Sequence, residues 1–444
     1  LLGCTDPGPT PATSVDTDTE VPSPTPTADT AAPAPEAPTL LSPAEALDLD
    51  PAPDVLHVSL VAATHTWDGV DGYAYNNQVP GPTLRARVGD TLVVDLDNQL
   101  GMPTSIHWHG VDVPFAMDGA GWQVSPVGAG ETFTYTFTLE QAGTFWYHPH
   151  FDTEHQVDLG LYGVLIVEDP AEPVVDSELV VVFDGPAEVA ASEGDPTVDP
   201  TPTTWLVNGL REPAWRPNAG ETVRVRMLNA SNAGYVALDD VRVIARDRGL
   251  LGAPDAAVVL APGDRAELEW AVDATPLAVD AVPWSLAGPT VNPAVPLFTV
   301  EPVGALEAPE PVAWPFSPAG PTADPGHTDL RYTFTGSAAA GWEINGQTWP
   351  AIAPDVVSLG SEIILEIRNP SPAHHPFHLH GMAFEVLSID GVPPAQRLTE
   401  DTLDIGVQET VRLRIEADNP GDWMSHCHIL PHAEDGMMTV FSVQ

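Results

Sequence analysis

Residues 426 to 437 read His-Cys-His-Ile-Leu-Pro-His-Ala-Glu-Asp-Gly-Met, and they carry the most informative chemistry in the chain. Cys427 is followed by His432 and then by Met437. A thiolate, an imidazole and a thioether suit a blue-copper electron-transfer site once a second histidine joins them. His426 and His428 flank the cysteine, and side chains alternate along an extended strand. The two flanking histidines can therefore hold a different metal from the one that Cys427 binds.

Three further histidine clusters supply the remaining ligands that such an arrangement needs. They are His107-Trp108-His109-Gly110, His148-Pro149-His150 and His375-Pro376-Phe377-His378-Leu379-His380-Gly381. One His-x-His pair is weak support, because it also occurs by chance or as half of a zinc site. Ten of the 15 histidines fall in the four segments, which predicts metal binding. Zinc competes for imidazole ligands, but the single thiolate with a downstream methionine favours copper.

In this order the four motifs resemble those of the multicopper oxidases, the family of laccases, bacterial copper oxidases and bilirubin oxidase. The resemblance runs from about Val55 to the C-terminus and implies four copper ions. The type 1 copper would be held by His375, Cys427 and His432, with Met437 as axial ligand. The type 2 copper would take His107 and His378. One type 3 copper would take His109, His148 and His428, and the other His150, His380 and His426. Cys427, His426 and His428 would then carry electrons between the type 1 site and the trinuclear cluster.

Composition predicts an acidic, all-β protein of about three domains. The chain has 444 residues, 49 prolines and 36 glycines, and few long stretches with helical periodicity. It has 63 acidic and 15 basic residues, none of them lysine, for a formal net charge of −48. Such a surface repels nucleic acid and anionic lipid and attracts cationic substrates. Solubility or a salty habitat would favour the same composition. We expect no nucleic-acid partner.

The N-terminus predicts a lipid anchor on a flexible tether. Leu1-Leu2-Gly3-Cys4 resembles the end of a bacterial lipoprotein signal, in which the cysteine is lipidated. Residues 5 to 45 are dominated by Pro, Thr, Ala and Asp and contain no basic residue, as is typical of disorder. We expect an exported, monomeric protein of the bacterial cell envelope that touches the membrane only through lipid on Cys4. No disulfide remains if Cys4 carries lipid and Cys427 carries copper.

Three similar phrases indicate an internal repeat. They are Val88-Gly89-Asp90-Thr91-Leu92, Ala219-Gly220-Glu221-Thr222-Val223 and Leu359-Gly360-Ser361-Glu362-Ile363, each a turn followed by a strand that ends near an asparagine. With the resemblance, they predict three consecutive cupredoxin-like Greek-key β-sandwiches at residues 52–170, 171–305 and 306–444, after a disordered tether at 1–51.

The second predicted domain contains no ligand cluster, so we interpret it as a spacer without copper. The trinuclear cluster should then lie where the first and third domains meet. The phrases Trp205-Leu206-Val207-Asn208-Gly209 and Trp342-Glu343-Ile344-Asn345-Gly346 are interpreted as the strand-and-turn starts of two sandwiches rather than as sites. The histidines outside the motifs are expected to be surface or packing residues; they are His57, His65, His155, His327 and His374.

Proton delivery is the part of the family pattern that this chain changes. Many bacterial relatives have glutamate on both sides of the histidine equivalent to His432, whereas this chain has Pro431 and Ala433. Glu434 is a substitute one place along. Asp118 matches the acidic residue that the family places near the type 2 copper. It is a candidate catalytic residue with two open roles: to deliver protons, or to orient a type 2 ligand through a hydrogen bond.

These features predict a laccase-like multicopper oxidase. It would couple one-electron oxidation of a small reductant, such as a phenol, an aromatic amine or a reduced metal ion, to four-electron reduction of dioxygen to water. One alternative is a metal oxidase for Cu(I), Fe(II) or Mn(II), although the seven methionines form no methionine-rich insertion. A second is a copper-storage or electron-carrier protein without oxidase activity. A two-domain nitrite reductase is excluded because it lacks the His-Cys-His pair.

Overall fold

The first sandwich is built from strands whose apolar residues face one side. Along β4 (Thr91–Asn98), Leu92, Val94 and Leu96 are buried while the residues between them are partly exposed, as expected for a strand with one face on a core. Its sheets have the strand orders β2-β1-β4-β6 and β3-β8-β7-β5. The other strands are β1 (Val55–Trp67), β2 (Val70–Tyr75), β3 (Leu84–Arg87), β5 (His107–His109), β6 (Thr132–Thr138), β7 (Gly143–His148) and β8 (Gly163–Glu168).

The computed structural model describes residues 36–120, 125–185, 204–290, 293–337 and 339–444.

The second sandwich has three sheets, with the strand orders β11-β10-β9-β13-β16-β14-β15, β12-β20-β17 and β18-β19. The strands are β9 (Ser177–Asp184), β10 (Leu206–Val207), β11 (Leu210–Arg211), β12 (Ala214–Trp215), β13 (Thr222–Asn229), β14 (Val236–Arg246), β15 (Gly249–Leu260), β16 (Arg265–Ala271), β17 (Leu277–Ala281), β18 (Trp284–Ser285), β19 (Gly288–Pro289) and β20 (Val295–Val300).

The third sandwich has two larger sheets, with the orders β22-β21-β24-β29-β26-β27 and β23-β31-β30-β25-β28. The strands are β21 (Leu330–Ser337), β22 (Gly341–Ile344), β23 (Asp355–Val357), β24 (Glu362–Arg368), β25 (His375–Leu379), β26 (Phe384–Ile389), β27 (Thr399–Glu400), β28 (Thr402–Ile405), β29 (Thr410–Glu416), β30 (Gly421–Cys427) and β31 (Met438–Val443). Helical structure within the described ranges is limited to α1 (Thr153–Asp158), α3 (Leu430–Glu434) and the 3-10 turn η1 (Phe115–Met117).

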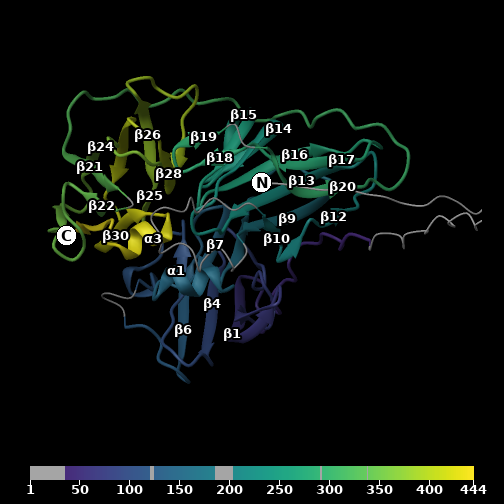
Figure 1. Cartoon of the computed structure of the whole chain (residues 1–444), viewed down its shortest axis with the longest axis horizontal. Coiled ribbons are helices and arrows are strands. Elements are labelled where there is room, and N and C mark those ends of the chain that lie inside the picture. Colours follow the sequence, from purple (N-terminus) through teal and green to yellow (C-terminus); the bar gives the residue numbers. More distant parts are fainter. Residues whose placement is uncertain (1–35, 121–124, 186–203, 291–292, 338) are drawn as a thin grey trace, which may run out of the picture. The chain divides into compact units, whose positions relative to one another are not determined.

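The first and third sandwiches share a core, and this brings distant segments of the chain together. Their buried apolar residues form one continuous cluster, whereas the second sandwich has a core of its own. Helix α3, near the C-terminus, lies beside α1 of the first sandwich (Figure 1). Residues of the first and third sandwiches, which are far apart in the sequence, therefore meet at a buried interface.

The repeat has a physical basis in three buried asparagines. Each one ends a strand or follows its last residue, and its side-chain amide donates hydrogen bonds to backbone carbonyls that close the following loop. They are Asn98, Asn229 and Asn369, each at most 1% exposed. Because a buried amide needs partners, this position restricts the loop that follows it in every sandwich. In the third sandwich that loop leads directly into His375.

The all-β class and the cupredoxin-like sandwiches predicted from the sequence are confirmed. Every sheet draws its strands from only one of the three predicted ranges, while the boundaries themselves stay a prediction. The predicted tether extends too far at its C-terminal end. Leu40 is 1% exposed and its N–H donates to Ala214 O at 2.8 Å, and Arg85 forms an ion pair with Glu45 at 2.7 Å. Cys4 and the rest of the tether before residue 36 lie outside the described residues. Among the residues that the structure describes, no helix has the length and apolarity to cross a bilayer.

Candidate metal centres

One cysteine and two histidines of the third sandwich converge at a buried point. Cys427 Sγ lies 3.5 Å from His375 Nδ1 and 3.6 Å from His432 Nδ1, and the two nitrogens are 3.2 Å apart. Cys427 ends β30, which pairs with β25, and His432 lies in α3. Met437 is buried and its carbonyl accepts a hydrogen bond from the Cys427 N–H at 3.1 Å. This donor set fits the trigonal His₂Cys arrangement of a blue-copper site.

Burial determines the protonation of these ligands. It raises the pKa of the Cys427 thiol, so copper binding, which requires the thiolate, must release a proton. Burial lowers the pKa of His432 to about 3, which leaves its imidazole neutral and free to coordinate. The Nε2 atom of His375 lies 2.8 Å from Ser371 Oγ, so its Nδ1 faces the cysteine.

Eight further imidazoles meet between the first and third sandwiches. In the first sandwich β5 pairs with β7, which sets His107 opposite His148. In the third, β25 pairs with β30, which sets His378 opposite His426. Every one of the eight is buried except the partly buried His150. The full set is His107, His109, His148, His150, His378, His380, His426 and His428.

The pair predicted to bind type 2 copper has the geometry of a shared ion. The Nε2 atoms of His107 and His378 are 3.4 Å apart and face each other across the interface. Their Nδ1 atoms lie 3.0 Å from Asp118 O and 2.9 Å from Asp401 O. A ring N–H bonded to a carbonyl fixes the tautomer and leaves the opposite nitrogen free to bind metal.

The six predicted type 3 ligands make up two predicted groups of three. In the first, the nitrogens of His150, His380 and His426 lie within 4.8 Å of one another, whereas His109 and His148 of the second form such a group with His107 rather than with His428. Nε2 of His426 lies 3.5 Å from His150 Nε2 and 3.1 Å from His380 Nε2. In the second group, the His428 ring lies 4.9 Å from the His109 ring and 5.7 Å from the His148 ring. His109 Nδ1, His148 Nε2 and both His428 nitrogens are buried without a hydrogen-bond partner among the described residues. Buried polar atoms are rarely left unpaired, so these nitrogens mark ligand positions.

Burial keeps most of the imidazoles of the cluster neutral across the ordinary pH range. Burial, together with the neighbouring rings, lowers the pKa of His380 to about 4 and that of His426 to about 3. The pKa values of His109, His148, His150, His378 and His428 are also well below the usual range, first because of burial and then because of adjacent imidazoles. Neutral imidazole is the form that binds copper.

Asp118 connects the two sandwiches at this cluster. Its Oδ1 lies 3.2 Å from His107 Nδ1 and its Oδ2 lies 2.9 Å from His380 Nδ1, and the residue is 1% exposed. Burial alone would raise the pKa of this carboxyl, but the rings of His380 and His107 beside it hold the pKa well below its usual range. A residue that accepts from two ligand imidazoles, from His380 through its carboxylate and from His107 through its carbonyl, orients them. The geometry therefore favours the orienting role over proton delivery.

Sequence reasoning missed a second carboxylate and its support. Asp401 Oδ1 lies 3.2 Å from His109 Nε2, and the neighbouring Thr402 Oγ1 lies 2.8 Å from the same nitrogen. Arg265 of the second sandwich donates to both oxygens of Asp401, at 2.7 and 2.6 Å. No spacing motif marks these residues. The second sandwich contributes no residue to the metal-binding groups found in the described parts of the chain, yet it holds the cluster through Arg265.

Glu434 follows the type 1 region at the end of α3. Its Oε1 accepts a hydrogen bond from the Thr153 N–H of α1 at 3.0 Å. It lines a cavity of about 300 Å³ that also reaches His150 and His426. Glu434 thus stands between solvent-accessible space and one predicted type 3 group, whereas Ala433 offers no ionisable atom there.

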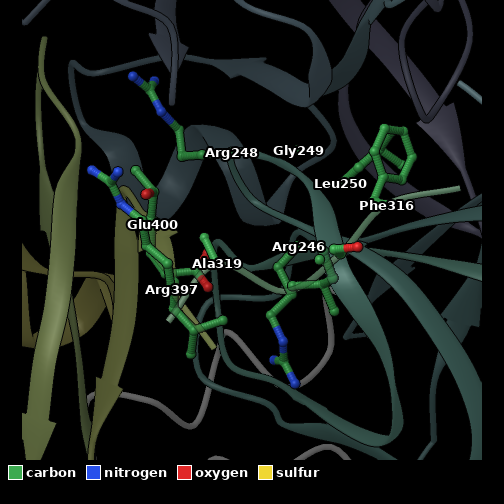
Figure 2. A pocket seen from close by; sticks show the side chains of 13 residues that line it. Arg246, Arg248, Gly249, Leu250, Phe316, Ala319, Arg397 and Glu400 are labelled. Carbon is green, nitrogen blue, oxygen red and sulfur yellow. The ribbon is translucent and has the colours of Figure 1, made fainter. Parts of the chain in front are cut away.

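A separate cavity of about 390 Å³ lies between the second and third sandwiches and is lined by Arg246, Arg248 and Arg397 (Figure 2). Each guanidinium already has a carboxylate partner. Arg246 pairs with Asp255 at 3.4 Å, Arg248 with Asp112 at 2.8 Å and Arg397 with Glu385 at 3.1 Å. In Figure 2 the guanidinium group of Arg246 points to the opposite side from those of Arg248 and Arg397. These arginines stabilise contacts between elements and do not converge on a ligand.

Consecutive β-sandwiches, one cysteine-centred site and an eight-histidine cluster between the first and third define a copper-dependent oxidoreductase. The multicopper oxidase family profile matches residues 61–172 and 321–444, which contain all the predicted ligands. The chain is 30% identical over 436 residues to the multicopper oxidase MmcO of Mycobacterium tuberculosis, covering 83% of this chain and 82% of that protein. The chain belongs to the multicopper oxidase family, whose members are copper-binding oxidoreductases that use dioxygen as acceptor.

Other relatives differ in the type of oxidase that their names give. The chain is 26% identical over 487 residues to Laccase-2 of Pleurotus ostreatus, covering 88% of this chain and 87% of that enzyme. The multicopper oxidase of Pseudomonas thermotolerans has a similar structure, with a TM-score of 0.74 and 30% identity, covering 88% of this chain and all of that one. The multicopper oxidase of Campylobacter jejuni, described as a metallo-oxidase, shares the fold with a TM-score of 0.79 at 24% identity, covering 92% and 96%.

Proposed function

We propose that the protein is a laccase-like multicopper oxidase that holds four copper ions. One would be a type 1 ion at His375, Cys427, His432 and Met437, and three would occupy the eight-histidine cluster. The single observation that carries this proposal is the His-Cys-His sequence at the end of β30. Cys427 points to one site while His426 and His428 point to the other.

When bound, the copper ions would supply one-electron oxidation of a reductant at the type 1 ligands and, at the eight-histidine cluster, reduction of dioxygen by four electrons and four protons to two waters. The protein supplies the path, because Cys427 is covalently joined to His426 and His428. A hydrogen bond of 2.9 Å between His426 Nδ1 and the Cys427 carbonyl adds a second connection. Asp118 and Asp401 orient the imidazoles, and burial keeps bulk water away from them.

Cys427→Ser tests the type 1 assignment. The colour of a blue-copper site arises from copper bound to thiolate, so this variant should lose the intense blue absorption and the oxidase activity together. The eight-histidine cluster is untouched, so the variant should still fold and retain the other copper ions by metal analysis. Blue colour that persists in Cys427→Ser would rule out the assignment.

The proposed substrates are small reductants, namely phenols, aromatic amines or reduced metal ions. The second candidate, a metal oxidase for Cu(I), Fe(II) or Mn(II), is supported by the net charge of −48, which concentrates cations at the surface. Oxygen uptake by the copper-loaded protein with each reductant separates the two, because a metal oxidase would prefer metal ions over every phenol in the panel. Copper storage or electron carriage without turnover would give no oxygen uptake with any of them.

We further propose that the protein is exported, monomeric and anchored in the bacterial cell envelope by lipid on Cys4. Acyl chains contribute roughly 0.8 kcal/mol per buried CH₂, whereas an acidic segment gains nothing from anionic lipid. Cys4→Ala, expressed behind a complete signal sequence, should move active enzyme from the membrane fraction to the soluble fraction. Retention of this variant in the membrane would contradict the anchor.

A further inference from the structure

One tryptophan covers both imidazoles of the proposed type 1 site. The indole of Trp342 lies 4.5 Å from the His432 ring at an interplanar angle of 38°. Its centroid is 4.9 Å from that of His375, with an edge-on angle of 73°. Trp342 and His432 are each 5% exposed and His375 is fully buried. A single side chain therefore contacts both nitrogen ligands and separates them from water.

The β21–β22 hairpin holds Trp342 in this position. In the register of the two strands Gly336 lies opposite Trp342. A Cβ atom at residue 336 would lie 3.0 Å from Trp342 Cα and 2.1 Å from the Gly341 carbonyl oxygen, and the φ of Gly336 is +108°. Only glycine allows the strands to approach this closely. The indole is thus placed by backbone geometry and not by a flexible loop.

The same place in the other sandwiches also holds an aromatic residue. In each sandwich an asparagine with positive φ donates its side-chain amide to the neighbouring strand, and the aromatic residue lies three positions before it. The pairs are Tyr73 with Asn76, Trp205 with Asn208 and Trp342 with Asn345. Tyr73 contacts His155, which is outside the ligand groups, and Trp205 packs against Phe183. The interpretation of the Trp342 phrase as only a strand start was therefore incomplete.

The effect of Trp342 on the reduction potential depends on which imidazole lies nearest to solvent. His375 turns its Nε2 towards buried Ser371, so it has no route to the surface. His432 is the more exposed of the two, and Trp342 lies on it. Keeping water away from a metal site lowers its local dielectric, which favours the ion of lower charge. For copper that ion is the reduced one, so the cover should raise the reduction potential.

We propose that Trp342 is a positioning residue of the type 1 site, which keeps water off His432, raises the reduction potential of the copper and limits direct contact between bulky reductants and the imidazole. This inference rests on the proposed function. It predicts that a smaller residue at position 342 lowers the potential while the cysteine–copper bond survives.

Trp342→Ala tests the proposal on the copper-loaded enzyme, with Trp205→Ala as the matched control. Trp205 is 2% exposed and occupies the equivalent repeat position, so its loss creates a comparable cavity far from the ligands. We expect blue absorption in both variants. The reduction potential of Trp342→Ala, measured by redox titration, should fall by about 59 mV. For one electron this corresponds to a tenfold change in the equilibrium constant for copper reduction. Trp205→Ala should match the parent protein.

A second variant and a second readout keep the test decisive. If Trp342→Ala does not fold, Trp342→Phe replaces it in the test. This variant retains an aromatic ring, so its reduction potential should fall by less than the value expected for Trp342→Ala. In either variant the ratio of kcat/KM for 2,6-dimethoxyphenol to that for Fe(II) should rise at least threefold, because the phenol gains access to His432. A blue variant whose potential and ratio equal those of Trp205→Ala would overturn the proposal. Absence of blue colour from the parent protein itself would instead refute the type 1 assignment.

Discussion

Replacement of Asp118 by asparagine separates orientation of ligands from delivery of protons. The carboxylate accepts from His380 Nδ1 in the third sandwich at 2.9 Å, and its other oxygen lies 3.2 Å from His107 Nδ1 in the first, whose N–H faces the Asp118 carbonyl at 3.0 Å. An asparagine keeps one oxygen and turns an N–H group towards the other ring. If that N–H group faces His380, the buried His380 N–H loses its acceptor; if it faces His107, it opposes a ring N–H that keeps only the Asp118 carbonyl as acceptor.

The size of the effect follows from that lost partner. A buried donor left unpaired costs about 1–3 kcal/mol, which corresponds to roughly 5- to 150-fold in an equilibrium or rate. Outer partners of metal ligands typically contribute about 10- to 100-fold to metal affinity or activity. We therefore expect Asp118→Asn to lose about 10- to 100-fold in copper affinity at the cluster or in turnover.

The assay combines copper content after dialysis against a chelator with oxygen uptake, and the blue absorption serves as an internal standard. Asp95→Asn is the control, because Asp95 bonds His57, a histidine outside the ligand groups, at 2.8 Å. The imidazoles beside Asp118 hold its pKa far below the working range, so the deficit should be equal at all pH values tested. Full copper content with normal turnover would refute the orienting role. A deficit that grows as pH rises would point to proton delivery.

Three further outcomes test other parts of the site. The copper-stripped protein should lose stability as pH falls below about 6.5, because His380 has a folded pKa of about 4 and His426 and His432 of about 3, so the unfolded chain binds more protons. Between its unfolded and folded pKa values, each of these histidines should lower the free energy of unfolding by about 1.4 kcal/mol per pH unit. A melting temperature that stays constant from pH 7 to pH 4 would contradict this prediction. Arg265→Met should lower the free energy of unfolding, measured with denaturant, by about 3–5 kcal/mol, because it leaves Asp401 charged without its arginine partner. Arg216→Met removes the arginine of a more exposed ion pair with Glu301, and a smaller loss in Arg265→Met than in this control would refute the role of Arg265. Glu434→Gln keeps an oxygen for the Thr153 N–H but removes the charge; turnover should fall at unchanged copper content, and normal turnover would mean that protons reach the cluster elsewhere.

The ligands were predictable because their spacing is local. His107 and His109, or His426 and His428, are placed on one side of the chain by the alternation of an extended segment, so the sequence alone indicates which residues can face the same cluster. Their assembly across sandwiches came from resemblance. The pairing of His107 with His378 spans 271 residues, and nothing in either motif states that they meet.

Other features depend on contacts that carry no sequence signal. Arg265 and Asp401 are 136 residues apart, and an arginine in a domain without ligands gives no reason to associate it with the cluster. Trp205 and Trp342 stand in matching phrases, but only one has imidazoles beneath it. The segment around Leu40 has the composition of a disordered tether, yet a few apolar residues are enough to attach it to the second sandwich.

The position of the cluster between the first and third sandwiches also has a consequence for biosynthesis. A nascent chain that has folded its first two sandwiches presents only His107, His109, His148 and His150, which is half of the cluster and none of the type 1 site. Copper bound at that stage would lack part of its ligand set. It would also lack the Cys427 thiolate through which electrons reach the cluster in the proposed function. The complete set of ligands for oxygen reduction therefore forms only when the third sandwich docks, so the order of folding prevents a partly assembled site from reacting with oxygen.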